Sequence, residues 1–392
     1  MKIDSVDFFY VAMPEVTTAA DGSQDALVVR VSAGGHTGWG ECEAAPLPSI
    51  AAFVCPMSHG ACRPVSASVL GQKLEGPDDI KRMAADVGYN SMDLLQATHT
   101  WSGIEMAMWD LLGKVRSVPA WKLLGYNRTY PKTPYASVLF GQTPQQTLER
   151  GREMRKCGFH AAKFGWAPFG YSLEGDIAHL DAAREGLGPD GILLIDAGQI
   201  FGEDVEAAAL RLDAMERNRV TFFEEPFHGF AYQAYHQLGE RAPTVRTAGG
   251  EAAHNRYMAE HLIDFGKVGY IQIDCGRIGG LWPARQVANH AARRGVTYIN
   301  HTFTSNLALS ASLQPFAGLE DHLAARRVDE IIARTRPRQA LGEEVPGGGH
   351  VAGEGPAADA AGKGQGQQHP VAGGAVLHGQ EPAQHGQCVE QG

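Results

Sequence analysis

The sequence contains no apolar run that approaches the roughly 20 residues needed to cross a bilayer, which argues against a membrane-spanning protein. Its start, MKIDSVDFFYVAM, alternates like a β-strand and has no cleavage-site pattern, so we expect no signal peptide and a cytoplasmic location. Positive charge is also scarce. The net charge of -10 disfavours binding to nucleic acid, because its phosphates would be repelled.

Cysteine is sparse, and no two cysteines have the CxxC spacing that is typical of zinc and redox sites. The six cysteines are Cys42, Cys55, Cys62, Cys157, Cys275 and Cys388. In a chain of 392 residues this pattern predicts reduced thiols, each acting as a small apolar side chain, and neither a disulfide framework nor a zinc site.

The chain is long enough for two or three domains with a sizeable core, and its first 125 residues predict an α+β domain. Two apolar stretches around Gly-Gly-His-Thr-Gly in DALVVRVSAGGHTGWGEC indicate a β-hairpin. Residues 45–72 suggest a loop followed by a short helix. Residues 77–124 have helical periodicity, with Ile104, Met108, Leu111 and Leu112 on one face.

Residues 126–330 alternate between short strands and helices, a pattern that predicts a parallel sheet. Eight strand positions favour a closed barrel. The alternative, a doubly wound sheet, would require a Gly-rich phosphate loop after an early strand, and the sequence has none. The tail, residues 335–392, is rich in Gly, Ala, Gln, Pro and His, so we expect it to be irregular or disordered.

Polar residues stand at the predicted end of one barrel strand after another, about one strand–helix unit apart. They are Lys163, Asp196, Glu224, Glu251, Asp274, His301 and Glu320. Because the carboxyl ends of barrel strands meet at one mouth, we expect these side chains to converge there.

Three successive strand ends carry the carboxylates of Asp196, Glu224 or its neighbour Glu225, and Glu251. Such a group cannot remain fully ionised without a compensating charge, and oxygen ligands without Cys or His suit Mg²⁺. We therefore predict a Mg²⁺ site. The alternative is that each carboxylate caps the helix that follows it.

His301 and Asp274 end neighbouring strands and are expected within hydrogen-bonding reach. A carboxylate partner orients an imidazole and raises its pKa, which makes it a better base. Lys163 is predicted to act as a base or as a cation for a substrate carboxylate, with a structural salt bridge as the alternative. Glu320, with Asp321 as a competitor, is predicted to hydrogen-bond a substrate oxygen in its protonated form.

Several segments in order carry a family resemblance: GWGE at 38–41, SGIEMAMWDLLGK at 102–114, then LLIDAG, FFEEP, AGGE, DCGRIGG and INH. From residue 1 to about 325 the sequence resembles the enolase superfamily, in particular its mandelate-racemase-like subgroup (with the muconate lactonizing enzymes). The resemblance implies a modified TIM barrel, (β/α)₇β, under an α+β N-terminal capping domain. It also implies particular roles: Asp196, Glu224 and Glu251 as Mg²⁺ ligands, Glu225 as a neighbour that pairs or hydrogen-bonds outside that set, His301 and Asp274 as the catalytic dyad, and Glu320 near the enediolate.

Two features depart from the family pattern. Racemases of the subgroup carry Lys-x-Lys on the second strand, and Gly165 replaces the second lysine here. With His301 as the base on one face of the carbon, the arrangement best resembles a dehydratase (a hydro-lyase) of an acid sugar, an aldonate or aldarate. The tail is the second departure, because in the family the chain after the barrel completes the cap. A cycloisomerase, an epimerase or an impaired barrel that binds a metal and an acid remain as alternatives.

Cap loops choose the substrate in this family, and three residues are candidates for contacts with it. His59 and Arg63 could bind hydroxyls or a carboxylate, or form ordinary loop hydrogen bonds, and Trp166 could pack on a sugar or form part of the barrel wall. The expected partner is a small carboxylate, without nucleic acid or membrane, and the resemblance implies a homo-oligomer.

Overall fold

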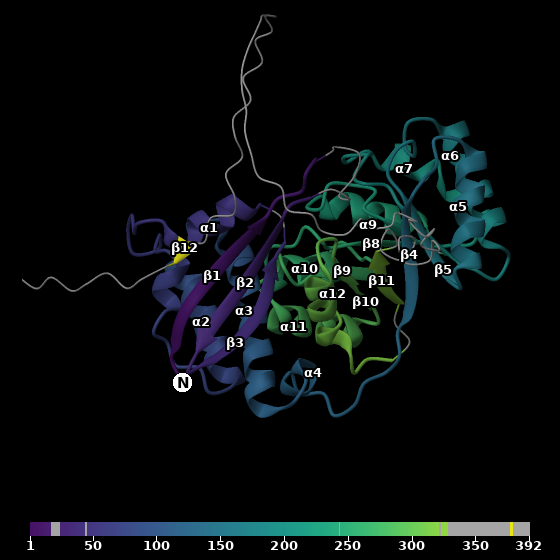
Figure 1. Ribbon diagram of the computed structural model, residues 1–392. Helices are drawn as coiled ribbons and strands as arrows, with labels where there is room; N and C mark the ends of the chain where they lie inside the picture. Colours follow the sequence, from purple (N-terminus) through teal and green to yellow (C-terminus); the bar gives the residue numbers. More distant parts are fainter. Residues whose placement is uncertain (17–23, 44, 243, 321–322, 328–376, 379–392) are drawn as a thin grey trace, which may run out of the picture.

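Three antiparallel strands form the main part of the sheet of the N-terminal cap: β1 (Ile3–Val11), β2 (Ala26–Ala33) and β3 (His36–Cys42) (Figure 1). The structure is a computed structural model and describes residues 1–16, 24–43, 45–242, 244–320, 323–327 and 377–378. Buried and partly exposed side chains alternate along β2, as expected of a strand with one face on a core. The predicted hairpin is confirmed, since Gly34 and Gly35 turn the chain between β2 and β3 with positive φ angles.

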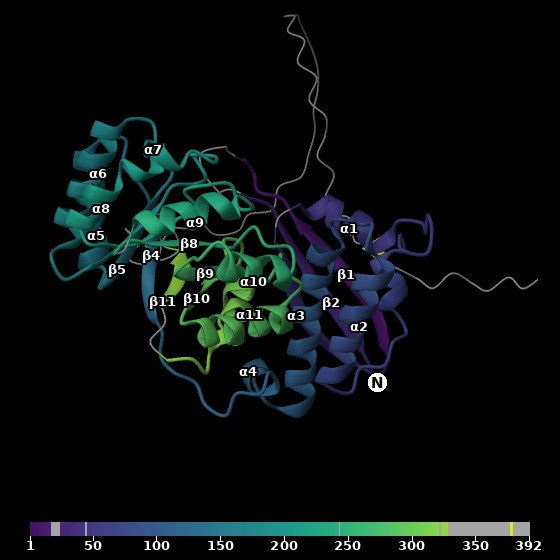
Figure 2. The same cartoon turned by 180° about the vertical axis from the view of Figure 1, so that it is seen from behind.

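Helices cover one face of this sheet, and α3 lies between the sheet and the barrel (Figure 2). The cap helices are α1 (Pro46–Val54), the 3-10 helix η2 (Val65–Ser68), α2 (Pro77–Asn90), α3 (Ala97–Arg116) and α4 (Ala120–Leu123). Two glycines of the GWG segment let α3 approach β3 closely. A Cβ on Gly38 would stand 2.0 Å from the carbonyl oxygen of Ala107, and one on Gly40 would stand 2.0 Å from that of Gly103.

The segment after β3 differs from its prediction. We expected a loop and then a short helix over residues 45–72, but the segment begins with α1 and only η2 follows it. Pro46 occupies the first turn of α1, where the missing N–H has no partner to lose. Proline therefore starts this helix in place of the expected loop.

Eight parallel strands form the barrel, and helices pack around it. The strands are β4 (Thr133–Leu139), β5 (Ala161–Gly165), β6 (Ile192–Asp196), β7 (Val220–Glu224), β8 (Arg246–Gly249), β9 (Tyr270–Asp274), β10 (Thr297–His301) and β11 (Leu323–Arg327). The helices are α5 (Pro144–Lys156), α6 (Leu173–Leu187), α7 (Val205–Ala209), α8 (Leu212–Arg217), α9 (Tyr232–Arg241), α10 (Arg256–Asp264), α11 (Leu281–Arg294), α12 (Asn306–Ser312) and η3 (Gln314–Phe316). Every neighbouring strand pair is parallel, and the end strands β10 and β11 contact each other, so the sheet curls into the predicted barrel.

One cluster of apolar side chains, one from each of seven barrel strands, lies inside the barrel. This interior layer consists of Tyr135, Ala161, Leu194, Phe222, Ala248, Ile299 and Leu323. Its members are buried, so the barrel is a packed core with its chemistry at one end.

Most of the predicted irregular tail, residues 335–392, lies outside the described residues. Within it, β12 (Leu377–His378) pairs with β1 in antiparallel fashion. The cysteines in the described part of the chain are free thiols. Cys388 lies outside that part. No helix in the described ranges has both the length and the apolar character needed to cross a membrane.

Candidate active site

The polar residues of the barrel mouth stand two positions after the interior layer on their strands. Side chains alternate along a strand, so these residues also point into the barrel, but nearer its carboxyl end. They are Lys163, Asp196, Glu224 and His301, all of which are buried. Asp274 ends β9 and Glu251 follows β8 by two residues, so the predicted convergence at strand ends is confirmed for these six.

Lys163 lies between two carboxylates. Its Nζ is 2.9 Å from Asp196 Oδ2 and 2.5 Å from Glu224 Oε1. Burial disfavours the ammonium, but the two carboxylates outweigh it and raise the pKa of Lys163 well above its ordinary value. Burial, together with the charge of Asp196, raises the pKa of Glu224 to about 8. Lys163 therefore provides part of the positive charge that this carboxylate group needs.

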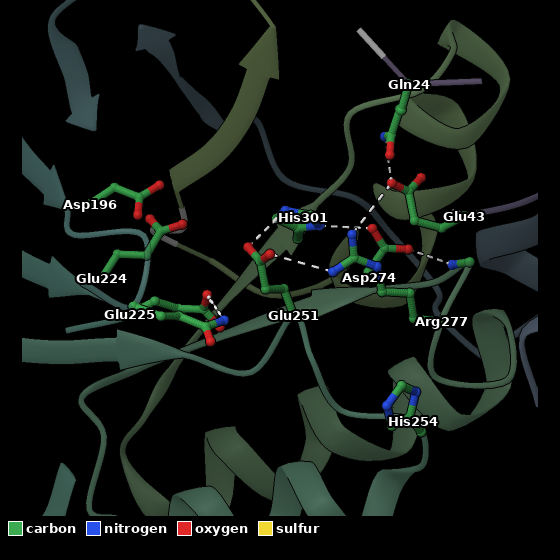
Figure 3. Close-up of polar contacts among 12 residues, drawn as sticks. Gln24, Glu43, Asp196, Glu224, Glu225, Glu251, His254, Asp274, Arg277 and His301 are labelled. Carbon is green, nitrogen blue, oxygen red and sulfur yellow. Dashed lines mark hydrogen bonds and ion pairs between the residues drawn. The ribbon is translucent and has the colours of Figure 1, made fainter. Parts of the chain in front are cut away.

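His301 also lies between two carboxylates (Figure 3). Its Nδ1 is 2.7 Å from Asp274 Oδ2, and its Nε2 is 2.8 Å from Glu251 Oε2 as an ion pair without the alignment of a hydrogen bond. The Gly276 N–H donates to Asp274 Oδ1 at 2.7 Å and so fixes that carboxylate. Burial opposes the imidazolium, but Glu251 and Asp274 outweigh it and raise the pKa of His301 to about 10.

Two further residues of the mouth were not expected from the sequence. Arg277 lies between Glu251 and Glu43, with Nη1 3.4 Å from Glu251 Oε1 and Nη2 3.6 Å from Glu43 Oε1. Burial and the Asp274 charge raise the pKa of Glu43 to about 7. The sequence did carry a signal for Glu43, because it follows Glu41 by two positions at the end of a cap strand and so shares its side of the strand.

The prediction for Glu320 is wrong. This residue precedes β11 and so lies at the opposite end of the barrel from the mouth. Its side chain is 59% exposed, with Oε1 3.7 Å from Arg128 Nη2. The apolar run before it, read as a strand, contains the 3-10 helix η3, which periodicity in a short run does not distinguish from a strand. Asp321, its predicted competitor, lies outside the described residues.

The cap candidates His59 and Arg63 make contacts within the cap. His59 Nε2 is 2.9 Å from Asp93 Oδ2, and the Arg63 backbone hydrogen-bonds with Asn90 and Ser91 at the end of α2. The structure therefore does not bring these two side chains together with the residues of the barrel mouth.

Trp166 follows β5 directly, in the left-handed region with φ 66°, and is partly buried. A Cβ on Gly198, in the loop after β6, would lie 3.1 Å from the Trp166 ring. The ring thus packs over this loop, as expected of a side chain in the barrel wall.

The carboxylates of Asp196, Glu224 and Glu251 offer oxygen atoms, the donor type that suits Mg²⁺. Glu224 Oε2 is buried without a hydrogen-bond partner among the described residues, which leaves it available to a cation. Figure 3 shows Asp196 and Glu224 side by side, while Glu251 turns toward His301 and Arg277.

Within the described ranges, no three His, Cys, Asp or Glu side chains are already arranged to hold a metal ion. The trio fits a divalent cation by its charge and its donor atoms. Binding by all three carboxylates would require Glu251 to exchange its cationic partners for the metal.

Glu225 is buried beside this group, with a positive φ of 36°. Its Oε2 accepts a hydrogen bond from Gln199 Nε2 at 2.7 Å. This contact agrees with the expectation that Glu225 hydrogen-bonds next to Glu224.

Two family descriptions match the chain. The mandelate racemase/muconate lactonizing enzyme N-terminal domain matches residues 9–125, and the enolase C-terminal domain-like family matches residues 146–354. The chain belongs to the enolase superfamily, in its mandelate racemase/muconate lactonizing enzyme subgroup. Members of this superfamily use a divalent metal ion.

Among curated relatives, the chain is 28% identical to D-galactarolactone cycloisomerase of Agrobacterium fabrum, over 79% of this chain and 80% of the relative. It is 26% identical to D-galactonate dehydratase of Klebsiella pneumoniae, over 71% of this chain and 72% of the relative.

Two solved structures are also similar. A predicted mandelate racemase from Rhodobacter sphaeroides is 67% identical, with a TM-score of 0.80, covering 83% of this chain and 84% of that one. A mandelate racemase/muconate lactonizing protein from Paracoccus denitrificans, complexed with magnesium, is 25% identical, with a TM-score of 0.71, covering 86% of this chain and 88% of that one.

Proposed function

We propose that this protein is a Mg²⁺-dependent dehydratase of an acid sugar, an aldonate or aldarate. The observation that carries the proposal is the His301–Asp274 dyad, which faces Glu251 at a mouth where Gly165 stands in place of a second lysine. A base on one face of the carbon suits elimination, whereas racemisation needs a proton donor on the other face as well.

The surroundings of Gly165 support this choice. A Cβ there would lie 2.8 Å from the Asp196 Cβ and 3.2 Å from its carboxyl carbon. Gly165 and Asp196 are direct partners in the parallel pair β5–β6, so the Asp196 side chain takes the space that a side chain at position 165 would need. A second base on this strand is therefore incompatible with the present position of Asp196.

In the proposed reaction Asp196, Glu224 and Glu251 would hold Mg²⁺, which supplies positive charge for the substrate carboxylate. When Glu251 turns from His301 to the metal, the largest cause that raises the pKa of His301 is removed, and its Nε2 becomes free to take the α-proton. Asp274 keeps the imidazole in the tautomer and orientation for that task. Lys163 adds a cation near the carboxylate. His301 then returns the proton to the β-hydroxyl, the Cβ–O bond breaks, and water leaves. The enol rearranges to a 2-keto-3-deoxy acid.

The test is a screen of aldonates and aldarates with the purified protein and Mg²⁺, scored for 2-keto acid. We expect at least one acid sugar to give the keto acid in wild type, and none to react after Mg²⁺ is removed by a chelator. If no acid sugar reacts while one of them raises the melting temperature, the chain is a binding protein and the proposal fails.

The similarity to a cycloisomerase supports a second candidate, a lactone cycloisomerase acting through the same base. Product analysis separates the two reactions, because ring opening of a lactone isomerises the substrate, whereas an aldonate that loses water becomes lighter by that water. Exchange of the α-proton for solvent deuterium without loss of water would instead indicate an epimerase.

A further inference from the structure

Glu43 is a cap residue that contacts the barrel mouth. It follows the end of β3, and its side chain is 1% exposed. Its Oε1 accepts a hydrogen bond from Gln24 Nε2 at 2.7 Å, and its Oε2 accepts one from Thr304 Oγ1 at 3.1 Å. Gln24 belongs to the cap and Thr304 to the loop after β10, so Glu43 joins the two domains at the mouth.

The Glu43 backbone also packs on the segment that fixes the dyad. Its N–H donates to the Gly276 carbonyl at 3.4 Å, and a Cβ on Gly276 would lie 2.5 Å from the Glu43 Cβ. The Gly276 N–H in turn holds Asp274, the partner of His301. The cap therefore contacts the dyad through this glycine, where a larger residue would separate them.

Arg277 links Glu43 to the proposed metal ligand Glu251. The guanidinium lies at 3.6 Å from one carboxylate and 3.4 Å from the other, and the side chain is 15% exposed. A poorly hydrated guanidinium that loses one of two carboxylate partners binds the other more strongly. The charge of Glu43 thus limits how tightly Arg277 holds Glu251.

We propose that Glu43 is a positioning residue that, by sharing Arg277 with Glu251, frees Glu251 to bind the metal when the cap is seated on the barrel. The inference rests on the metal assignment made in the proposed function. It goes beyond that function by making a cap carboxylate a determinant of metal affinity.

The first test is calorimetric titration of full-length wild type and Glu43→Gln with Mg²⁺ alone at pH 8.5, above the pKa of Glu43. The Gln side chain keeps the shape, and its amide group can donate to Thr304 while its oxygen accepts from Gln24, so the charge is the main loss. We expect the dissociation constant for Mg²⁺ to rise about tenfold, as for other changes in the partners of a metal ligand. An unchanged constant in folded Glu43→Gln would overturn the inference.

Asp7→Asn is the matched control. Asp7 is also a buried cap carboxylate paired with an arginine, Arg30 at 2.9 Å, but it lies on β1. We expect this variant to be less stable while its Mg²⁺ affinity stays that of wild type. An equal loss of affinity in Asp7→Asn would mean that general weakening of the cap explains the effect, and would overturn the inference.

A double-mutant cycle tests the route through Arg277. In an Arg277→Met background, Glu43→Gln should leave the Mg²⁺ affinity unchanged, because the residue through which it acts has been removed. A tenfold effect that persists in this background would contradict the proposal. If Glu43→Gln does not fold, Glu43→Asp draws the carboxylate back from Arg277, and it should weaken Mg²⁺ binding in the same direction by a smaller factor.

These titrations use Mg²⁺ without substrate. The loss of Mg²⁺ affinity in Glu43→Gln can therefore be observed even if no acid sugar is dehydrated. Likewise, it can be absent even if an acid sugar is dehydrated.

Discussion

At the scale of single residues, His301 is the side chain on which turnover should depend most. His301→Asn removes Nε2, the atom proposed to take the proton, and keeps a polar side chain next to Asp274. We expect turnover to fall by about 10²–10⁴-fold or more, the usual contribution of a general base, with Mg²⁺ still bound. Steady-state kinetics and calorimetry on the same preparation measure the two effects.

His290 provides the matched control for this variant. It also pairs with an aspartate, with Nε2 3.0 Å from Asp264 Oδ1, but it lies on α11 outside the mouth. His290→Asn should retain wild-type turnover. Near-normal activity of His301→Asn would show that another group is the base.

Individual residues also show where sequence reasoning was sufficient. Lys163, Asp196, Glu224, Asp274 and His301 were located correctly because each sits within or at the end of a short strand with a clear apolar pattern. Their catalytic roles remain predictions. Strand position could not reveal that Lys163 and His301 serve as counter-ions to these carboxylates, since that depends on side-chain distances between strands.

At the scale of elements, the contact between α3 of the cap and α11 of the barrel is made by a buried carboxylate. Glu105, on α3, accepts hydrogen bonds from the first two backbone N–H groups of α11, those of Leu281 at 2.7 Å and Trp282 at 2.9 Å. Trp109 Nε1 donates to it at 2.6 Å. A carboxylate at a helix N-terminus is favourable, because those N–H groups have no partner within the helix.

The contribution of Glu105 to the stability of the protein should depend on pH. Burial outweighs the hydrogen bonds and raises the pKa of Glu105 from 4.5 to about 7. The native state then binds a proton more tightly than the unfolded chain, so the contribution of this group to stability is complete below pH 4.5 and is lost as the pH rises through 7. Glu105→Gln lacks this titration.

Urea unfolding of wild type and Glu105→Gln at pH 5 and pH 8 measures the effect. The free energy of unfolding of wild type, relative to that of the variant, should be higher at pH 5 than at pH 8 by up to about 3 kcal/mol. A difference that is the same at both pH values, or that grows at the higher one, would contradict the assigned shift.

Individual helices and strands also show why parts of the fold could not be predicted from the sequence. Alternating strands and helices predicted the barrel correctly, but the stretch before Glu320 was read as a strand although it contains a 3-10 helix. Glu105 gave no local signal, because its partners Leu281 and Trp282 are far away in the sequence. Contacts between domains depend on how the two pack, which periodicity within one segment does not describe.

At the scale of the whole molecule, metal binding should be visible as stability. Mg²⁺ that binds the native state and not the unfolded chain stabilises it by about 2.7 kcal/mol at 100 times the dissociation constant. We expect Mg²⁺ to raise the melting temperature of wild type and a chelator to reverse the rise. Glu251→Gln should lose most of the response together with turnover.

Glu260→Gln is a suitable control, since Glu260 pairs with Arg256 at 3.1 Å on α10. It should respond to Mg²⁺ as wild type does. If the melting temperature of wild type does not depend on Mg²⁺ at any concentration, the metal assignment is wrong.

The contact between the cap and the barrel also affects how substrates can reach the mouth. Besides the contacts of Glu105, Ser102 Oγ accepts from the Gly279 N–H at 2.9 Å, and Tyr126 donates to the Pro315 carbonyl at 2.7 Å. Swinging the whole cap aside would break these buried bonds together and expose the apolar faces beneath them. Opening of the whole cap is therefore unfavourable, and we expect substrates to enter through small displacements of loops beside the mouth.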